Sequence, residues 1–142
     1  MRMTRKDIIS LLQLKGIKPS AARLKIMQIC CSSDLPLDVQ EVTSLLKNEI
    51  HLSTVYRTLE KFVAVGILER IDFQEGKFRY EFVRDHHHHV VCNDCGKVAD
   101  IKDSGIEKIE QSVSLQTGFI VTKHSLELFG LCNKCQRSTH HV

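Results

Sequence analysis

The sequence lacks any long apolar run, and this absence excludes an ordinary membrane-spanning protein. No apolar stretch approaches the roughly 20 residues that a transmembrane helix needs. The basic start of the chain, residues 1–9, also lacks the apolar stretch and the small-residue cleavage site of a secretory signal peptide. We therefore expect a cytoplasmic protein without a membrane partner, and 142 residues allow one domain or two small ones.

The sequence also has little net charge, and its small positive excess is unevenly distributed. The formal charge at pH 7 is +3; residues 1–83 contain 13 Lys and Arg against 10 Asp and Glu, whereas residues 84–142 contain seven of each. This distribution is a weak indication of a nucleic-acid partner for the first part of the chain. Apart from four consecutive histidines at 86–89, the sequence has no internal repeat or low-complexity segment.

The first part of the chain has the features of several short helices. Apolar residues recur at helical spacing in residues 5–15. Ser20 predicts the N-cap of a second helix, and Asp38 with Glu41 predicts the start of a third. Ser53 predicts the N-cap of a fourth helix, which Gly66 would end.

The residues that follow these helices predict a β-hairpin. Residues 67–73 and 77–83 are rich in β-forming side chains, and Gln74-Glu75-Gly76 joins them. Helices followed by a hairpin are typical of a winged helix-turn-helix, so we expect an α+β protein with such a DNA-binding domain over residues 1–83. The alternative is an ordinary small α+β domain without a role in DNA binding.

The second part of the chain, residues 84–142, predicts a compact α/β domain. Arg84 and Asp85 are the expected hinge between the two parts. Two strands, a helix and a long strand with alternating character are expected, in this order: residues 87–92, 97–101, 104–118 and 119–132.

Four of the six cysteines form two Cys-x-x-Cys pairs, and this pattern predicts a structural zinc site. Each pair can bind one side of a tetrahedral Zn²⁺ ion, which stabilises a domain with a small core. Two unrelated thiol pairs or a redox motif are the alternatives, although a thioredoxin-like motif would occur once, before a helix. The predicted ligands are Cys92, Cys95, Cys132 and Cys135; Cys30 and Cys31 end an apolar helix-like run and are expected to be buried.

The histidine run can supply ligands to two further metal sites. In an extended chain His87 and His89 point to one face, and His86 and His88 point to the other. A solvated edge strand is the alternative for the run. Glu107 also fits a capping box with Ser104, and a lone His124 is more often a partly buried histidine. The candidate partner ligands are Glu81, Asp100, Glu107 and His124.

Three segments resemble the ferric uptake regulator family of bacterial metal-responsive repressors. These are STVYRTLEKFVAVGI at residues 53–67, HHHHVVCNDCGKV at 86–98 and KHSLELFGLCNKC at 123–135, in matching order and spacing. The resemblance implies a winged-helix domain, a hinge and an α/β dimerisation domain. It also implies a homodimeric repressor, not an enzyme, that binds palindromic AT-rich operators in double-stranded DNA.

The resemblance further implies three metal sites. The four cysteines match the structural zinc site. A regulatory site for Fe²⁺, or alternatively Mn²⁺ or Zn²⁺, matches Glu81, His87, His89 and Asp100. A second site in the dimerisation domain matches His86, His88, Glu107 and His124.

One departure from the family pattern concerns the regulatory site. The family usually has a further histidine just before the third helix, where this chain has Pro36 or its neighbours. Glu81 would then be the sole ligand from the DNA-binding domain. The missing histidine argues against a peroxide-sensing member, and the absence of a thiolate near the hinge argues against a zinc-sensing member.

The resemblance also implies which residues contact DNA. In the recognition helix, Tyr56 and Arg57 match residues that touch base and phosphate. A surface salt bridge with Glu60 or Glu69 is the alternative for Arg57. The expected DNA-binding residues are Lys18, Ser53, Thr54, Tyr56 and Arg57.

A metal-dependent hydrolase is the alternative from a different class. It would use the histidine and carboxylate set with an open coordination position and a general base. The sequence has no separate nucleophile motif, and a basic winged helix would serve no purpose in such an enzyme.

Overall fold

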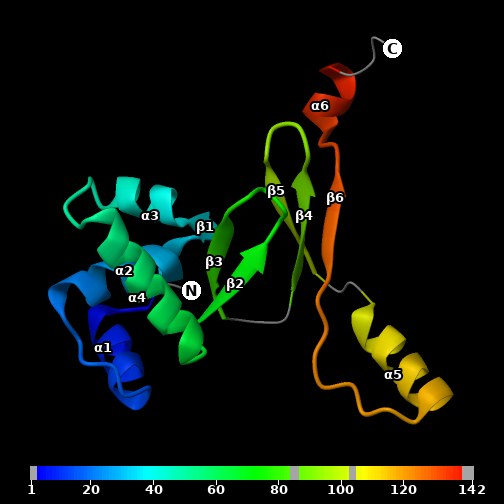
Figure 1. Ribbon diagram of the computed structural model, residues 1–142, viewed down its shortest axis with the longest axis horizontal. Coiled ribbons are helices and arrows are strands. Elements are labelled where there is room, and N and C mark those ends of the chain that lie inside the picture. The colour runs from blue at the N-terminus through cyan, green and yellow to red at the C-terminus, as the bar shows by residue number, and fades with distance from the viewer. Residues whose placement is uncertain (1–2, 84–86, 103–104, 139–142) are drawn as a thin grey trace. The chain divides into compact units, whose positions relative to one another are not determined.

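The computed structural model describes residues 3–83, 87–102 and 105–138, which form two compact units that divide between residues 84 and 85 (Figure 1). The expected hinge at Arg84 and Asp85 lies outside the described residues. The first unit contains α1 (Arg5–Leu14), α2 (Ala21–Ser32), β1 (Leu37–Asp38), α3 (Val39–Leu45), α4 (Leu52–Ala64), β2 (Leu68–Asp72) and β3 (Phe78–Phe82). The second contains β4 (His88–Cys92), β5 (Val98–Ile101), α5 (Ile106–Thr117), β6 (Glu127–Gly130) and α6 (Asn133–Ser138). This mixture of helix and sheet confirms the α+β class.

Local capping interactions explain where most helices of the first unit begin. The Ser20 side chain accepts a hydrogen bond from the backbone N–H of Arg23, which confirms the predicted cap of α2. Asp38 and Glu41 form a reciprocal capping box at α3, which is also confirmed. These bonds satisfy backbone donors that the first turn of a helix leaves without a partner.

The predicted cap of α4 was wrong, because the helix begins two residues earlier than expected. His51 is the N-cap, and its Nδ1 accepts a hydrogen bond of 3.2 Å from the backbone N–H of Ser53. Ser53 is therefore a helical residue, and its hydroxyl lies 2.8 Å from the same nitrogen. An imidazole nitrogen is an acceptor with sufficient reach to replace the usual hydroxyl or carboxylate.

The hairpin of the first unit packs with the helices around one core. Strands β2 and β3 pair antiparallel, with β1 on the other edge of β3. Gln74 and Gly76 adopt positive φ in the turn, where glycine has no steric penalty. The core includes Phe62 from α4 and Tyr80 from β3, both fully buried. This packing orients α4 relative to the hairpin, as in a winged helix-turn-helix (Figure 1).

The second unit contains a three-stranded sheet with β4 in the middle (Figure 1). Strand β4 pairs antiparallel with β5 and parallel with β6. The long strand predicted over residues 119–132 was wrong: β6 has four residues, and the six-residue helix α6 follows it. No residue of α5 is buried.

Within the described residues, no helix is both long enough and apolar enough to cross a membrane.

Candidate metal centres and DNA-binding face

The strand pairing of the second unit brings the two Cys-x-x-Cys pairs together. Cys92 ends β4, and its register partner Gly130 on β6 precedes Cys132 by two residues. After Cys92 the chain reverses in a tight turn, in which Gly96 has a φ of 76° and its N–H donates to the Cys92 carbonyl at 3.0 Å. The turn returns Cys95 toward Cys92, while α6 carries Cys135.

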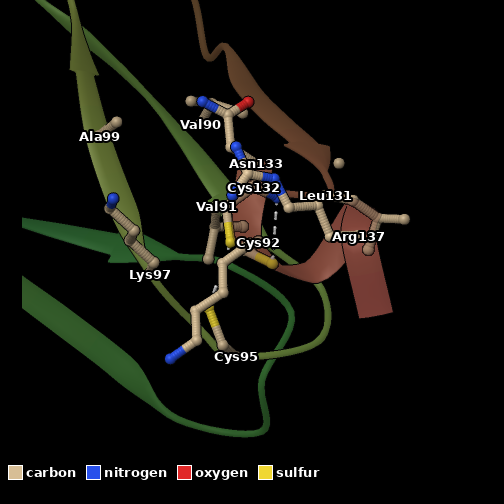
Figure 2. Close-up of a pocket in the computed structure, with 12 residues that line it drawn as sticks. Val90, Val91, Cys92, Cys95, Lys97, Ala99, Leu131, Cys132, Asn133 and Arg137 are labelled. Atoms are coloured by element: carbon tan, nitrogen blue, oxygen red, sulfur yellow. Dashed lines mark hydrogen bonds between the residues drawn. The ribbon is translucent and has the colours of Figure 1, made fainter. Parts of the chain in front are cut away.

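The sulfur atoms of the four cysteines have the spacing that one zinc ion requires. All four Sγ atoms lie within 4.8 Å of one another. The Sγ atoms of Cys95 and Cys132 are 3.7 Å apart. A tetrahedron with Zn–S bonds of about 2.3 Å has S–S edges of about 3.8 Å, so the cluster fits zinc with little rearrangement. Figure 2 shows Cys92, Cys95 and Cys132 gathered beside the strand ends.

The protonation of this cluster is uneven. The backbone N–H of Cys132 donates to Cys92 Sγ at 3.4 Å, and this bond is the main reason that the pKa of Cys92 is lowered to about 6. Hydrogen bonds with the neighbouring thiols, first that of Cys132, raise the pKa of Cys135 to about 12. At neutral pH Cys92 is therefore already the thiolate that a metal binds, whereas Cys135 has to release a proton.

A second group of candidate ligands lies on the same sheet. Nitrogen atoms of His87 and His89 and a carboxylate oxygen of Asp100 lie within 4.8 Å of one another. His89 is paired with Asp100 across β4 and β5, and its Nε2 lies 3.5 Å from Oδ1 of Asp100. With metal–ligand bonds of about 2.1 Å, tetrahedral ligands are about 3.4 Å apart, so this pair fits a divalent ion.

The first unit contains Glu81, which the sequence predicts as a regulatory ligand, and Pro36. Glu81 is a buried residue of β3, 4% exposed, opposite Glu69 on β2. The side chain of Pro36, which with its neighbours lies where the resemblance implies a histidine, is fully buried. Pro36 is thus a core residue, and it has no ligand atom.

Among the described residues, the structure brings together part of the predicted second site. Nε2 of His88 lies 3.0 Å from Nε2 of His124, so these two residues are together. The carboxylate in contact with Nδ1 of His124 is that of Glu110, which the sequence did not single out. Glu107 is exposed, and His86 lies outside the described residues. The signal for Glu110 was its position three residues after Glu107, on the same face of a helix.

The alternative interpretation of Glu107 as part of a capping box was wrong. The N-cap of α5 is Gly105, with a φ of 76° and no side-chain hydrogen bond. Glu107 is therefore the second helical residue, whereas a capping box requires the third. Ser104 lies outside the described residues.

Helix α4 presents a polar face with the residues expected to contact DNA. Its apolar side chains, such as Val55 and Leu59, are buried, while Ser53, Tyr56 and Arg57 are exposed. Thr54 is half-buried beside them, and Lys18 is exposed in the turn before α2.

Arg57 is not in the surface salt bridge that was the alternative for it. Its Nε donates to the Ser53 carbonyl at 3.3 Å, and Nη2 donates to Thr54 Oγ1 at 3.5 Å. The Glu60 carboxylate instead accepts bonds from Arg70 at 2.7 Å and from the Tyr80 hydroxyl at 2.5 Å. The Arg57 guanidinium therefore presents its positive charge at the exposed face of α4, without a carboxylate of any described residue bound to it.

A helical unit with a hairpin, followed by a sheet unit with clustered thiols and imidazoles, is the architecture of a metal-binding winged-helix regulator. Comparison with known proteins agrees. The sequence model of the ferric uptake regulator family matches residues 14–129. The ferric uptake regulation protein of Bordetella parapertussis is 40% identical over 127 residues, which are 86% of this chain and 91% of the relative.

Solved structures show the same similarity. The ferric uptake regulator of Vibrio cholerae is 34% identical with a TM-score of 0.78, over 87% of this chain and 98% of the other. The ferric uptake regulator of Pseudomonas aeruginosa, solved with manganese, is 30% identical with a TM-score of 0.76, over 89% and 98%. The chain belongs to the ferric uptake regulator family, which confirms the resemblance in its motifs and makes it a metal-responsive regulator.

Proposed function

We propose that this protein is a transcriptional repressor that binds palindromic AT-rich operators as a homodimer when a divalent metal occupies its regulatory site. It would act in the cytoplasm. Residues 1–83 form the DNA-binding domain in this proposal, and residues 84–142 form the domain for metal binding and dimerisation. Fe²⁺ is the proposed physiological metal, with Mn²⁺ as an alternative that the manganese-containing relative supports.

The observation that carries the proposal is the group of His87, His89 and Asp100. Two imidazoles and a carboxylate are ligands that suit Fe²⁺ and Mn²⁺ as well as Zn²⁺. Their ligand atoms already lie within 4.8 Å of one another, so the site requires little ordering when metal binds. We propose that Glu81 completes the set. Because Glu81 belongs to the DNA-binding domain, its bond to the metal would couple metal binding to the orientation of that domain.

The thiol cluster has a separate, structural role in the proposal. Buried apolar residues of the second unit are few, with Val91 and Val98 among them. A zinc ion bound by four thiolates would hold β4, β6 and α6 together where apolar burial is small. The second site, at His86, His88, Glu107 and His124, would bind a further divalent ion in the same domain.

Exposed apolar residues support the proposed homodimer. Leu115 and Ile120 are each 88% exposed, and Phe119 is 71% exposed. Burial of a side chain of this size contributes about 1.5–3 kcal/mol, so a second copy that covers them would gain considerable stability. Further exposed residues of this kind lie on the same unit: Ile109, Val113, Leu128, Phe129 and Leu131.

The DNA contacts of the proposal come from α4 and the turn before α2. Tyr56 offers a ring to a thymine methyl group, and Arg57 and Lys18 offer positive charge to phosphate and to the minor groove. Ser53 and Thr54 lie in the first turn of α4, where hydroxyl groups can contact the DNA backbone.

Operator binding at buffered metal concentrations tests the proposal. Zinc-loaded full-length protein would be titrated into a fluorescent palindromic AT-rich duplex with Fe²⁺ under anaerobic conditions, with Mn²⁺, with Zn²⁺, or with a chelator. We expect metal-dependent binding of one dimer per palindrome, and a scrambled duplex serves as the control. Equal affinity with metal and with chelator would contradict the proposal. Strongest activation by Zn²⁺ would instead indicate a zinc-sensing member of the family. Metal-catalysed oxidation of a ligand histidine would indicate a peroxide-sensing member.

A further inference from the structure

The ring of His124 uses its two nitrogen atoms toward two different residues. Nε2 lies 3.0 Å from Nε2 of His88 on β4, and Nδ1 contacts Oε1 of Glu110 on α5. His124 itself lies between α5 and β6, in a stretch without regular secondary structure. The ring plane is therefore determined by contacts with two separate elements of the second unit.

Glu110, and not the predicted ligand Glu107, is the carboxylate in contact with His124. The two residues are three positions apart and share one face of α5. Glu107 is exposed, and no hydrogen bond or ion pair connects it to another residue in the described part of the chain. The Glu110 and His124 side chains are 30% and 20% exposed, so their contact is partly protected from water.

The chemistry of imidazole gives this contact a consequence for metal binding. A neutral imidazole has a proton on one nitrogen and a lone pair on the other. A carboxylate that accepts the N–H on the far side of a metal-binding histidine fixes its tautomer and ring orientation, and raises its basicity. Glu110 would hold the proton on Nδ1 of His124, which leaves the lone pair on Nε2 directed toward His88.

The separation of the two Nε2 atoms agrees with a shared cation. Metal–nitrogen bonds of about 2.0–2.1 Å place tetrahedral ligands about 3.3–3.4 Å apart. The observed 3.0 Å differs from this by a few tenths of an ångström, which side-chain rotation can supply.

We propose that Glu110 is a positioning residue of the second metal site: it accepts the Nδ1–H of His124, presents Nε2 to a divalent cation bound with His88, and is not itself a ligand. This inference rests on the second site of the proposed function. Glu107, one turn earlier, keeps its carboxylate for the metal. The carboxylate that orients the imidazole and the carboxylate that binds the ion are thus different residues.

Cobalt binding and histidine NMR test this role. Full-length protein with zinc in the cysteine cluster and with His89→Ala, which disables the regulatory site, would be titrated with Co²⁺ and followed by visible absorption. Glu110→Ala should lower Co²⁺ affinity about 10- to 100-fold. Glu110→Gln, whose amide oxygen also accepts an N–H, should recover part of that loss. The absorption spectrum at saturation should be the same in both variants, because the ligands are unchanged.

The NMR measurement separates positioning from a general loss of structure. Proton–nitrogen correlation spectra of the metal-free histidine rings should show His124 with its proton on Nδ1 in the parent and in Glu110→Gln. Glu110→Ala should populate both tautomers. Lys108→Ala, a neighbouring exposed change on α5, should match the parent in affinity and spectrum.

Two results would overturn the role of Glu110. The first is parent-like affinity and tautomer in Glu110→Ala. The second is a Glu110→Gln variant as weak as Glu110→Ala with an altered spectrum at saturation, which would make Glu110 a direct ligand. His124→Ala distinguishes an error in the role of Glu110 from an error in the second site. If Co²⁺ still binds normally to His124→Ala, the proposed second site itself is wrong.

Discussion

Replacement of Arg57 by alanine is the sharpest test of the DNA-binding face. In the free protein the Arg57 guanidinium makes two long hydrogen bonds within α4, of 3.3 and 3.5 Å, at an exposed position. The Arg57 side chain therefore gives up only weak hydrogen bonds when it reorients to bind a DNA phosphate. A hydrogen bond to a charged group contributes about 1.5–3 kcal/mol, and ordering a long side chain costs up to about 2 kcal/mol. Because α4 already holds Arg57 partly in place, we expect about 1–2 kcal/mol for each protomer.

If the protein binds its operator as the proposed homodimer, this effect on affinity is doubled. A loss of about 2–4 kcal/mol corresponds to roughly 30- to 1000-fold weaker binding of Arg57→Ala. Removal of two phosphate contacts should also lower the magnitude of the slope of log affinity against log salt by about 1.8. Fluorescence anisotropy over a series of salt concentrations measures both quantities.

Arg57→Lys is the matched control, because it retains the charge and should retain the salt slope while losing part of the affinity. Metal content should be unchanged in both variants, since Arg57 belongs to the first unit and is remote in sequence from the thiols. Equal affinity of Arg57→Ala and wild type at every salt concentration would refute the reasoning.

Three further changes test the metal centres and the first unit. Cys132→Ser should release zinc and lower the melting temperature, and a variant that keeps its zinc argues against the site. Zinc affinity of the wild type should fall as pH falls, because Cys135 releases a proton on binding, and should fall more steeply below about pH 6, where the Cys92 thiolate also takes up a proton; chelator competition across pH measures this affinity. His89→Ala should abolish metal-dependent operator binding but retain zinc; a wild-type metal response would contradict the assignment of the regulatory site and point instead to His88 and His124. Tyr80→Phe removes the hydroxyl bound to Glu60 and should lower the free energy of unfolding by about 1.5–3 kcal/mol in urea titrations; a change of similar size when Glu60 is already Ala, which has no acceptor, would show that this bond is not the cause.

Local sequence signals predicted the features that depend on few neighbouring residues. The cap of α2 by Ser20 and the capping box of Asp38 and Glu41 each involve atoms three residues apart, so a short pattern is sufficient to identify them. The two Cys-x-x-Cys pairs could also be identified from a short pattern, because two cysteines at this spacing can bind one ion in many folds. Family membership followed from longer motifs in matching order.

The errors arose where partners come from distant parts of the chain. Residues 119–132 alternate like a strand, but β6 is limited to Glu127–Gly130 because its partner β4 has only five residues to pair with. The cap of α4 is an exception, because His51 and Ser53 are only two residues apart; this error arose because histidine is not among the usual N-cap residues. The burial of Pro36, like the length of β6, depends on tertiary packing. A histidine introduced at this buried position would disturb the core, so the missing ligand cannot simply be restored there.

The sequence by itself determined which chemistry is present: four thiols in two pairs, four adjacent histidines, and a polar helix face with tyrosine and arginine. The tertiary structure decided which of these groups meet. Strand alternation puts His89 with Asp100 and His88 with His124, and only the path of the chain around α5 decides that Glu110 contacts His124. The physical reason is that ligand identity is a property of a residue, whereas ligand geometry depends on distances between residues far apart in the chain, which pairing and packing establish together.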